Sequence, residues 1–240
     1  MSEKEIPLTG GMSTASVVRI GDRVHRSLPK NHAFVHSVLL HLEACNFPSS
    51  PRVLGMDEQG REILSFLDGE VPRDVPLSVR QKLEAIQLLR TFHDLLAESP
   101  LSGRQQTVCH NDFAPWNLIV NNESVVGIID FDELAPGKRV EDVAYYIWTA
   151  LDLGVAGCAD EVQLESMAQL VDGYGLEDRD EFIPALLRQQ NRILQFRHQV
   201  VLHGRDPVQR DFSKGAILRI EKSISWVQDH EQAIQQAIAS

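Results

Sequence analysis

Cysteine is scarce in this sequence, and no stretch of it is both long and apolar. The three cysteines, Cys45, Cys109 and Cys158, lie far apart and form no CxxC pair. Their spacing indicates neither a disulfide framework nor a zinc site. No segment approaches the roughly 18 apolar residues of a membrane span, and the N-terminal MSEKEIPLTGG lacks the apolar core of a secretory signal. We therefore expect a cytoplasmic protein with no membrane contact.

Positive charge is also in short supply. The 240 residues include 23 Lys and Arg against 34 Asp and Glu, a formal net charge of −11. Nucleic-acid-binding proteins neutralise phosphates with Lys and Arg, so this balance argues against a nucleic-acid partner. An acidic surface suits a cationic small molecule or serves only solubility, and the composition leaves both open. With 43% hydrophobic and 24% charged residues, the chain has the composition of a folded globular protein.

The first part of the sequence alternates short apolar runs with turns. Gly21-Asp22 is a hairpin-type turn, and a second turn falls at 57–60. Between them, apolar residues recur at helical spacing after Asn31, a residue type that caps helices. The pattern predicts three strands, a helix and two strands. The strands are expected from Ile6 and at 17–20, 24–26, 52–54 and 62–66.

After Asp68-Gly69 the periodicity becomes mostly helical. Helices are expected at 83–99, 140–152, 161–174, 179–204 and 215–239, and β-like runs at 117–120 and 124–129. No low-complexity linker separates the two halves. The sequence thus predicts an α+β fold with an N-terminal lobe over residues 1–67 and a mainly helical C-terminal lobe over 68–240, joined tightly at 66–70.

The chemistry is concentrated in the segment HNDFAPWNLIV, which begins at His110, and in IDFD, which ends at Asp132. A hairpin between the two segments would bring Asp112, Asn117 and Asp130 to one end. Carboxylate and amide oxygens are hard ligands suited to Mg²⁺ that carries phosphate oxygens. Asp112 would then be free to orient a hydroxyl nucleophile and take its proton during attack on phosphorus.

This pattern resembles a known family. His-x-Asp-x-x-x-x-Asn followed by Asp-Phe is similar to the catalytic loop and metal-binding segment of the protein-kinase-like fold. The form Asn-Asp-Phe-x-x-x-Asn-Leu-Ile with Ile-Asp-Phe is closer to the aminoglycoside phosphotransferase and choline kinase branch, and the resemblance covers roughly residues 8–150. It implies a two-lobed fold, ATP and Mg²⁺ as cofactors, Asp112 and His110 as catalytic residues, and Asn117 and Asp130 as metal ligands. It also implies that Asp142 braces the catalytic loop.

The resemblance places the nucleotide site in the first lobe. A phosphate-covering loop falls on the segment that contains Gly10, Gly11 and Ser13, where an ordinary hairpin loop is the alternative. The segment around Phe66 and Leu67 matches the hinge whose backbone groups would read an adenine edge.

Two departures from the family pattern concern the phosphate clamp. Arg26 stands where the family has a lysine that pairs with the phosphates; arginine keeps a permanent charge but has a different reach. The next helix lacks the glutamate that orients this cation. His36 is the best-placed residue, although we expect it to be an exposed helix residue, and Glu43 follows about two turns later.

Asp132 and Glu133 follow the predicted metal ligand. They are candidates for a second metal or a cationic acceptor, or they are solvated loop acids. The favoured function is an ATP-dependent phosphotransferase acting on a hydroxyl of a small and cationic molecule: an aminoglycoside, an amino sugar or a choline-like alcohol. The alternative is a catalytically impaired kinase-fold protein that sequesters a ligand or peptide, and the short first lobe, Arg26 and the missing helix glutamate favour it. The Arg-bearing first lobe also resembles that of some compact bacterial proteins associated with trifolitoxin-type peptide immunity.

A protein kinase fits poorly, because the stretch from Asp130 to Val143 is too short for an activation segment and a peptide-docking platform. The sequence does not decide between ATP and GTP, and it does not indicate an oligomeric state.

Overall fold

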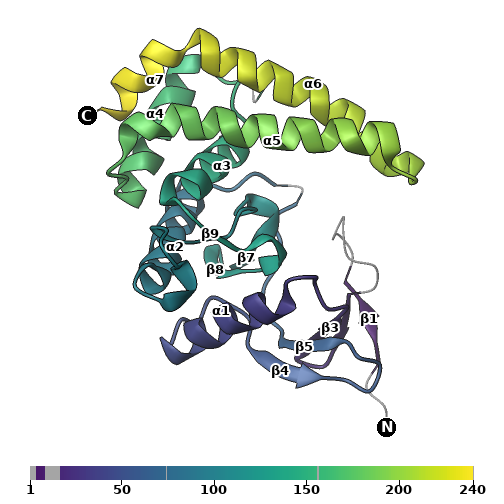
Figure 1. Ribbon diagram of the computed structural model, residues 1–240. Coiled ribbons are helices and arrows are strands. Elements are labelled where there is room, and N and C mark those ends of the chain that lie inside the picture. Colours follow the sequence, from purple (N-terminus) through teal and green to yellow (C-terminus); the bar gives the residue numbers. More distant parts are fainter. Residues whose placement is uncertain (1–3, 9–16, 74, 156, 240) are drawn as a thin grey trace.

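The computed structural model describes residues 4–8, 17–73, 75–155 and 157–239. It shows a small sheet-containing part beside a larger helical part (Figure 1). Among these residues, no helix combines the length and the apolar character that crossing a membrane requires. The predicted α+β organisation is the one that the chain adopts.

The N-terminal part is a five-stranded antiparallel sheet with one helix. The strand order is β1-β2-β3-β5-β4. Its elements are β1 (Ile6–Pro7), β2 (Val18–Ile20), β3 (Arg23–Arg26), α1 (His32–Ala44), β4 (Val53–Met56) and β5 (Glu62–Ser65). Helix α1 buries the apolar stripe Val35, Val38, Leu39 and Leu42, as its helical spacing predicts. The predicted order of three strands, a helix and two strands is confirmed.

Strands β3 and β5 place two charged residues opposite each other. Their antiparallel register pairs Arg26 with Glu62 and, two residues along the strands, Val24 with Leu64. Because alternate residues of a strand face the same side, Glu62 points inward with Leu64 and is fully buried. The register therefore places a carboxylate inside the protein beside a buried arginine.

The connection between the two parts is attached to the helical part by backbone hydrogen bonds. Glu70 exchanges two such bonds with Val120, N–H to O in each direction at 2.9 Å. Gly69 precedes it with φ +139°, and a Cβ there would lie 2.5 Å from the Val120 carbonyl oxygen, so the close approach requires glycine. The lobe boundary after residue 67 stays a prediction; it lies two residues before Gly69.

The C-terminal part is built mainly of helices. They are α2 (Val79–Ala97), α3 (Arg139–Leu151), α4 (Asp160–Tyr174), α5 (Phe182–His203), α6 (Pro207–Asp229) and α7 (Glu231–Ile238), with short 3₁₀ helices at Pro100–Ser102 and Arg179–Glu181. Helix α2 begins at a capping box in which Ser78 and Gln81 each bond the other's backbone N–H. Helices α5 and α6 run side by side and extend beyond the rest of the helical part (Figure 1).

The last predicted helix differs from the observed one at its start and in its continuity. Helix α6 begins at Pro207 rather than at residue 215, with the Asp206 carboxylate accepting from the Val208 N–H at 2.9 Å. The helical region then breaks at His230, whose ring stacks on Trp226 with centroids 4.6 Å apart. His230 Nε2 also donates to the Asp160 carboxylate of α4 at 3.2 Å, so a tertiary contact holds this break without a proline or glycine.

Two short strand pairs carry the loops that matter for function. The predicted hairpin is present as β7 (Leu118–Asn121) and β8 (Ser124–Ile128). A second pair, β6 (Thr107–Cys109) with β9 (Ala135–Gly137), was not expected from the sequence, because three-residue strands give almost no periodic signal. The 3₁₀ turns Pro115–Asn117 and Phe131–Glu133 connect these strands.

Candidate active site

Three oxygen-bearing side chains converge at one end of the β7–β8 hairpin. Asn117 Nδ2 donates to Asp112 Oδ2 at 2.8 Å and to the Asp112 backbone oxygen at 2.9 Å. The Ile129 N–H donates to the Asn117 carbonyl at 2.9 Å, which places Asp130 beside Asn117. Asp112 and Asp130 are both partly exposed, so solvent reaches the cluster.

The backbone is in a sparsely populated conformation on both sides of this cluster. Asn111 has φ 63° and Asp130 has φ 64°, both left-handed. Asn and Asp are the non-glycine residues that tolerate this region best, and such positions concentrate at functional sites. The two turns aim Asp112 and Asp130 toward the same space.

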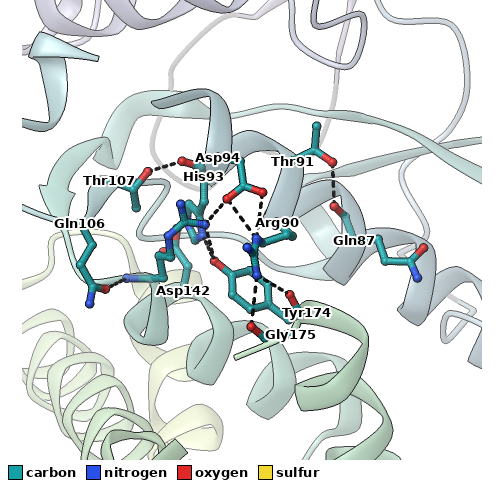
Figure 2. A network of polar contacts seen from close by, with 11 residues as sticks. Gln87, Arg90, Thr91, His93, Asp94, Gln106, Thr107, Asp142, Tyr174 and Gly175 are labelled. Carbon is teal, nitrogen blue, oxygen red and sulfur yellow. Dashed lines mark hydrogen bonds and ion pairs between the residues drawn. The ribbon is translucent and has the colours of Figure 1, made fainter. Parts of the chain in front are cut away.

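Asp142 fixes the backbone of the loop that precedes Asp112. Its carboxylate accepts from the backbone N–H of His110 at 2.6 Å and of Asn111 at 2.8 Å. His93 Nε2 donates to the same carboxylate at 3.0 Å, and the Tyr174 hydroxyl donates to His93 Nδ1 at 2.6 Å. Figure 2 shows His93 between these two partners. The loop ahead of Asp112 is therefore fixed by a buried network, the bracing that the resemblance implies for Asp142.

Burial moves the pKa of both members of this network. Burial acts to raise the pKa of Asp142, but the hydrogen bonds from His93 and from the backbone more than offset it, and the pKa is lowered. Burial lowers the pKa of His93, against the attraction of Asp142. The network thus consists of an ionised carboxylate and a neutral imidazole. It continues to Arg90, which bonds Asp94 and the carbonyl groups of Tyr174 and Gly175 (Figure 2).

Tyr145 is a contact of Asp112 that the sequence did not reveal. Its hydroxyl donates to Asp112 Oδ1 at 2.8 Å. Burial and the nearby Asp112 raise the pKa of Tyr145 well above its usual value, so the phenol stays protonated. Each oxygen of Asp112 therefore has one fixed donor, and a carboxylate with about four acceptor positions still has room for a substrate hydroxyl.

His110 does not reach the open side of the cluster. Its side chain is fully buried, in ring contact with Phe92, Phe113 and Phe131. Nε2 donates to the Ile129 carbonyl at 3.2 Å. The expectation of a catalytic histidine gives way to a positioning role, because a buried ring that holds the strand end next to Asp130 cannot touch a substrate.

Arg26 is held by carboxylates on two sides. Nε donates to Glu62 Oε1 at 2.7 Å, one terminal nitrogen donates to Asp132 Oδ1 at 2.7 Å, and the other lies 3.9 Å from Asp130. Burial acts to lower the pKa of Arg26, but Asp132 and Glu62 raise it above its usual value. The guanidinium is thus charged, and it points at the two aspartates of the 129–132 segment.

The carboxylate that the helix lacks comes from strand β5. Glu62 takes the place of the missing helix glutamate, and His36 Nε2 donates to its second oxygen at 2.7 Å. His36 was expected to be exposed, but 21% of its side chain is accessible and it orients Glu62. Sequence reasoning missed Glu62 because only the strand register brings it next to Arg26. The available signal was an acid at an inward-facing position of an apolar strand.

The cluster fits a divalent cation by its donor set and its charge. Asp112, Asp130 and Asp132 are close enough to repel one another, and both burial and Asp132 raise the pKa of Asp130. Asn117 turns its amide nitrogen to Asp112, so that its oxygen Oδ1 remains for coordination. Carboxylate and amide oxygens match the preference of Mg²⁺.

A second group of potential metal ligands is engaged elsewhere. His93, Cys109 and Asp142 lie together in the core. Cys109 Sγ donates to the Lys138 carbonyl at 3.2 Å, and burial raises the pKa of this thiol, so it stays protonated. Since thiolate is the metal-binding form, the group is structural.

The predicted nucleotide residues fall in three different situations. Gly10, Gly11 and Ser13 lie outside the described residues. The Phe66 N–H donates to the Asp22 carbonyl at 2.8 Å, and its ring lies 3.7 Å from the Arg19 guanidinium. No described residue bonds the N–H of Leu67, so of the two hinge positions Leu67 has the donor available for a base.

The two acids after Asp130 differ in their environment. Asp132 is bound by Arg26, and its backbone oxygen accepts from Asn31 at 2.9 Å. Glu133 is exposed, and its backbone oxygen accepts from Asn111 at 2.8 Å. Asp132 therefore links the sheet to the helical part across the cluster.

The sequence comparisons agree with this geometry. The model of the "Phosphotransferase enzyme family" matches residues 25–181. The trifolitoxin immunity protein of Rhizobium leguminosarum bv. trifolii is 31% identical, over 98% of this chain and 99% of that protein.

Solved structures share the fold. The GDP complex of aminoglycoside 2'-phosphotransferase-IIIa superimposes with a TM-score of 0.66 at 15% identity, covering 94% of this chain and 93% of that one. A choline/ethanolamine kinase family protein from Mesorhizobium loti gives a TM-score of 0.65 at 15% identity, covering 98% and 92%. The predicted kinase-like fold is confirmed.

Proposed function

The chain belongs to the phosphotransferase enzyme family, and from this premise we propose that it transfers the γ-phosphoryl group of Mg·ATP to a hydroxyl of a small molecule. The observation that carries the proposal is the convergence of Asp112, Asn117 and Asp130 at one partly exposed point. The GDP complex of a structural relative supports a nucleotide site in such a fold.

Asp112 acts as the catalytic base. It orients the acceptor hydroxyl and takes its proton as the oxygen attacks the γ-phosphorus. The new O–P bond forms while the bond from the γ-phosphorus to the bridging oxygen breaks, and ADP leaves with that electron pair. Tyr145 and Asn117 keep the carboxylate oriented throughout, because each donates to one of its oxygens.

Asn117 Oδ1 and the Asp130 carboxylate would hold Mg²⁺, which neutralises charge on the phosphates when bound. Arg26 supplies the second positive charge at this place. Its terminal nitrogens face Asp130 and Asp132, so phosphate oxygens would replace Asp132 as their partners. Glu62 and His36 keep the guanidinium in position during this exchange.

The charge of the acceptor is a separate question. The sequence favours a cation because of the acids near the cleft, and one structural relative forms a complex with kanamycin. At this site, however, Asp132 is neutralised by Arg26, and Glu133 lies exposed after it. These two acids offer a cationic acceptor little beyond general attraction.

A second candidate is a protein that binds a ligand without phosphoryl transfer. It is favoured by the full-length similarity to the trifolitoxin immunity protein. The double pairing of Arg26 with Glu62 and Asp132 also supports it, because a nucleotide has to displace one of these carboxylates. Titration with Mg·nucleotide separates the two candidates, since only the phosphotransferase needs the nucleotide.

The proposal is tested with Asp112→Ala. We expect ADP release from Mg·ATP to fall by about 10²- to 10⁴-fold because the base is lost, while Mg·nucleotide binding persists. Glu123→Gln, an exposed turn residue, serves as the control with unchanged turnover. Equal turnover in Asp112→Ala and in the wild type would remove Asp112 from the chemistry.

A further inference from the structure

Helix α5 differs in charge from the rest of this acidic chain. Over Phe182–His203 it contains no Asp or Glu, although the whole chain has 34. Its charged and titratable residues are Arg188, Arg192, Arg197, His198 and His203. The helix packs against α3, the helix that presents Tyr145 to Asp112. A helix without acids thus lies beside the proposed base.

Arg192 reaches from α5 to the catalytic loop. One terminal nitrogen donates to the Asn111 carbonyl at 2.8 Å, and Nε donates to Gln189 at 2.9 Å. Its guanidinium lies 5.7 Å from the centre of the Tyr145 ring. Arg192 also lines an open hollow of about 660 Å³ on the same helix, together with Arg188 and Asn191. The side chain therefore connects the residue before Asp112 to open space.

Arg197 brings a second positive charge toward the same base. Its guanidinium lies 5.4 Å from the Phe196 ring and 5.1 Å from the Phe212 ring of α6. Nε is buried and has no hydrogen-bond partner among the described residues. Burial lowers the pKa of Arg197, while Tyr145 and Asp112 attract the charged form. Burying a guanidinium whose N–H has no hydrogen-bond acceptor costs free energy, and a bound anion that accepts from this N–H would reduce the cost.

No described carboxylate forms an ion pair with Arg192 or Arg197. The contrast is Arg188, one turn earlier on α5, which pairs with Glu141 at 2.7 Å and lies 3.6 Å from Glu181. In a chain where acids outnumber bases, two such arginines on the α5 side of Asp112 favour a negative partner from outside.

We propose that Arg192 and Arg197 form an anion-binding subsite of the acceptor pocket, and that the acceptor is an alcohol that also carries a carboxylate or phosphate group. The anionic group binds the two guanidinium groups, and the hydroxyl lies at Asp112. This rests on the phosphotransferase function proposed above and deepens it. It replaces the cationic acceptor expected from net charge, because the α5 side of Asp112 carries two arginines and no acid.

The test is binding of four small alcohols, measured by thermal shift and calorimetry without nucleotide. D-glycerate carries a carboxylate, glycerol 3-phosphate a phosphate, glycerol no charge and choline a positive charge. We expect one or both anionic alcohols to bind at millimolar concentration and the other two not to bind. Preference between the two anions identifies the group that the subsite takes.

The variants connect this binding to the subsite. Arg192→Gln with Arg197→Met, which keeps the apolar stem between the two rings, should weaken anion binding about tenfold or more. The control is Arg80→Gln on α2, an exposed arginine that pairs with Glu84 and does not line the hollow, with binding unchanged. Arg192→Lys keeps the charge and should retain part of the affinity, which a merely structural role would not explain.

Three results would overturn the proposal: no anion bound by the wild type at millimolar concentration, tighter binding of choline than of both anions, or equal anion binding in the double variant. None of these readouts needs nucleotide. A wild type that binds the anionic alcohols through these arginines but neither binds nor turns over Mg·ATP would retain the subsite while removing the phosphotransferase function.

Discussion

Glu62 pairs with Arg26 from a strand, where the family pattern has a glutamate from a helix. The sequence indicated that the cation-orienting glutamate of α1 was missing. The structure supplies the carboxylate from β5 and supports it with His36 from the helix, so the charge pattern is complete. Residue identity at one aligned position is therefore a poor guide to whether the clamp is intact, because a strand register can supply the same group.

Glu62→Gln should lower the free energy of unfolding by about 3 kcal/mol, because it removes one partner of a buried pair and leaves Arg26 and His36 without their carboxylate. Urea titration measures the loss. Glu43→Gln on α1 is the control, since Glu43 is exposed and a surface substitution changes stability by no more than about 0.5 kcal/mol. Equal effects of the two substitutions would show that Glu62 is not the residue that holds Arg26.

His93 gives the protein a predictable response to acid. Its folded-state pKa lies below the ordinary 6.5 because burial of the ring, together with the nearby Arg139, outweighs the attraction of Asp142 and Asp94. As the pH falls below 6.5, His93 is therefore protonated in the unfolded chain before it is protonated in the folded protein. The contribution of His93 to the free energy of unfolding is therefore fully present above pH 6.5 and is lost as the pH falls below it.

Urea titrations between about pH 7.5 and pH 5 test this expectation. The free energy of unfolding should fall toward about pH 5 in the wild type and more gently in His93→Gln, which cannot titrate. His198→Gln, an exposed position on α5, should keep the slope of the wild type. A His93→Gln protein with the same slope would assign the acid response to other groups.

At the scale of elements, the parts with strong periodicity were predictable. Helices α3 and α4 begin and end within one residue of their expected bounds, and α1 buries the expected stripe. The pair β6 and β9 was missed because each strand has three residues and is stabilised by its partner. The early start of α6 had a local signal, Asp206 followed by Pro207, whereas the break at His230 involves a contact with the distant Asp160 of α4.

Some residues of the candidate site were likewise predictable from the sequence and others were not. Asp112, Asn117 and Asp130 were predictable because a motif and a hairpin turn fix them locally. Tyr145 and the arginines of α5 were not, since their proximity to Asp112 depends on helix packing. A fixed sequence spacing cannot encode such contacts.

The connecting element between sheet and helices should be sensitive to a single methyl group. Gly69→Ala places Cβ against the Val120 carbonyl at φ +139°, so we expect a loss of about 3 kcal/mol in the free energy of unfolding. The control is Gly60→Ala, where φ is +75° and no atom lies within 4 Å, with a loss of about 1 kcal/mol. Thermal denaturation of both variants measures the two losses. A Gly69→Ala protein as stable as Gly60→Ala would contradict the close approach of Gly69 to Val120.

At the scale of the molecule, the candidate site lies where the sheet and the helical part meet. Arg26 and Asn31 from the first part both bind Asp132 from the second. Figure 1 shows the β7–β8 hairpin on the side of the helical part that faces α1 and the sheet. A nucleotide bound by Arg26, Asn117 and Asp130 would therefore contact both parts at once.

Mg·ATP should for this reason stabilise the whole protein in one transition. At about a hundredfold excess over Kd the gain is about 2.7 kcal/mol, seen as a higher Tm. Chelation of the metal with EDTA should remove most of the gain, because the proposed ligands hold the nucleotide through Mg²⁺. A gain that is the same with and without the metal would contradict the role of Asn117 and Asp130.

The most direct measurement is calorimetric titration of Mg·ATP and Mg·GTP into the wild type and into Asp130→Asn. The central claim, that Asp130 and Asn117 beside Asp112 form a Mg·nucleotide site, predicts saturable heat for at least one nucleotide in the wild type and a large loss of affinity in the variant. The absence of heat with both nucleotides at millimolar concentration, or equal affinity in the variant, would contradict it.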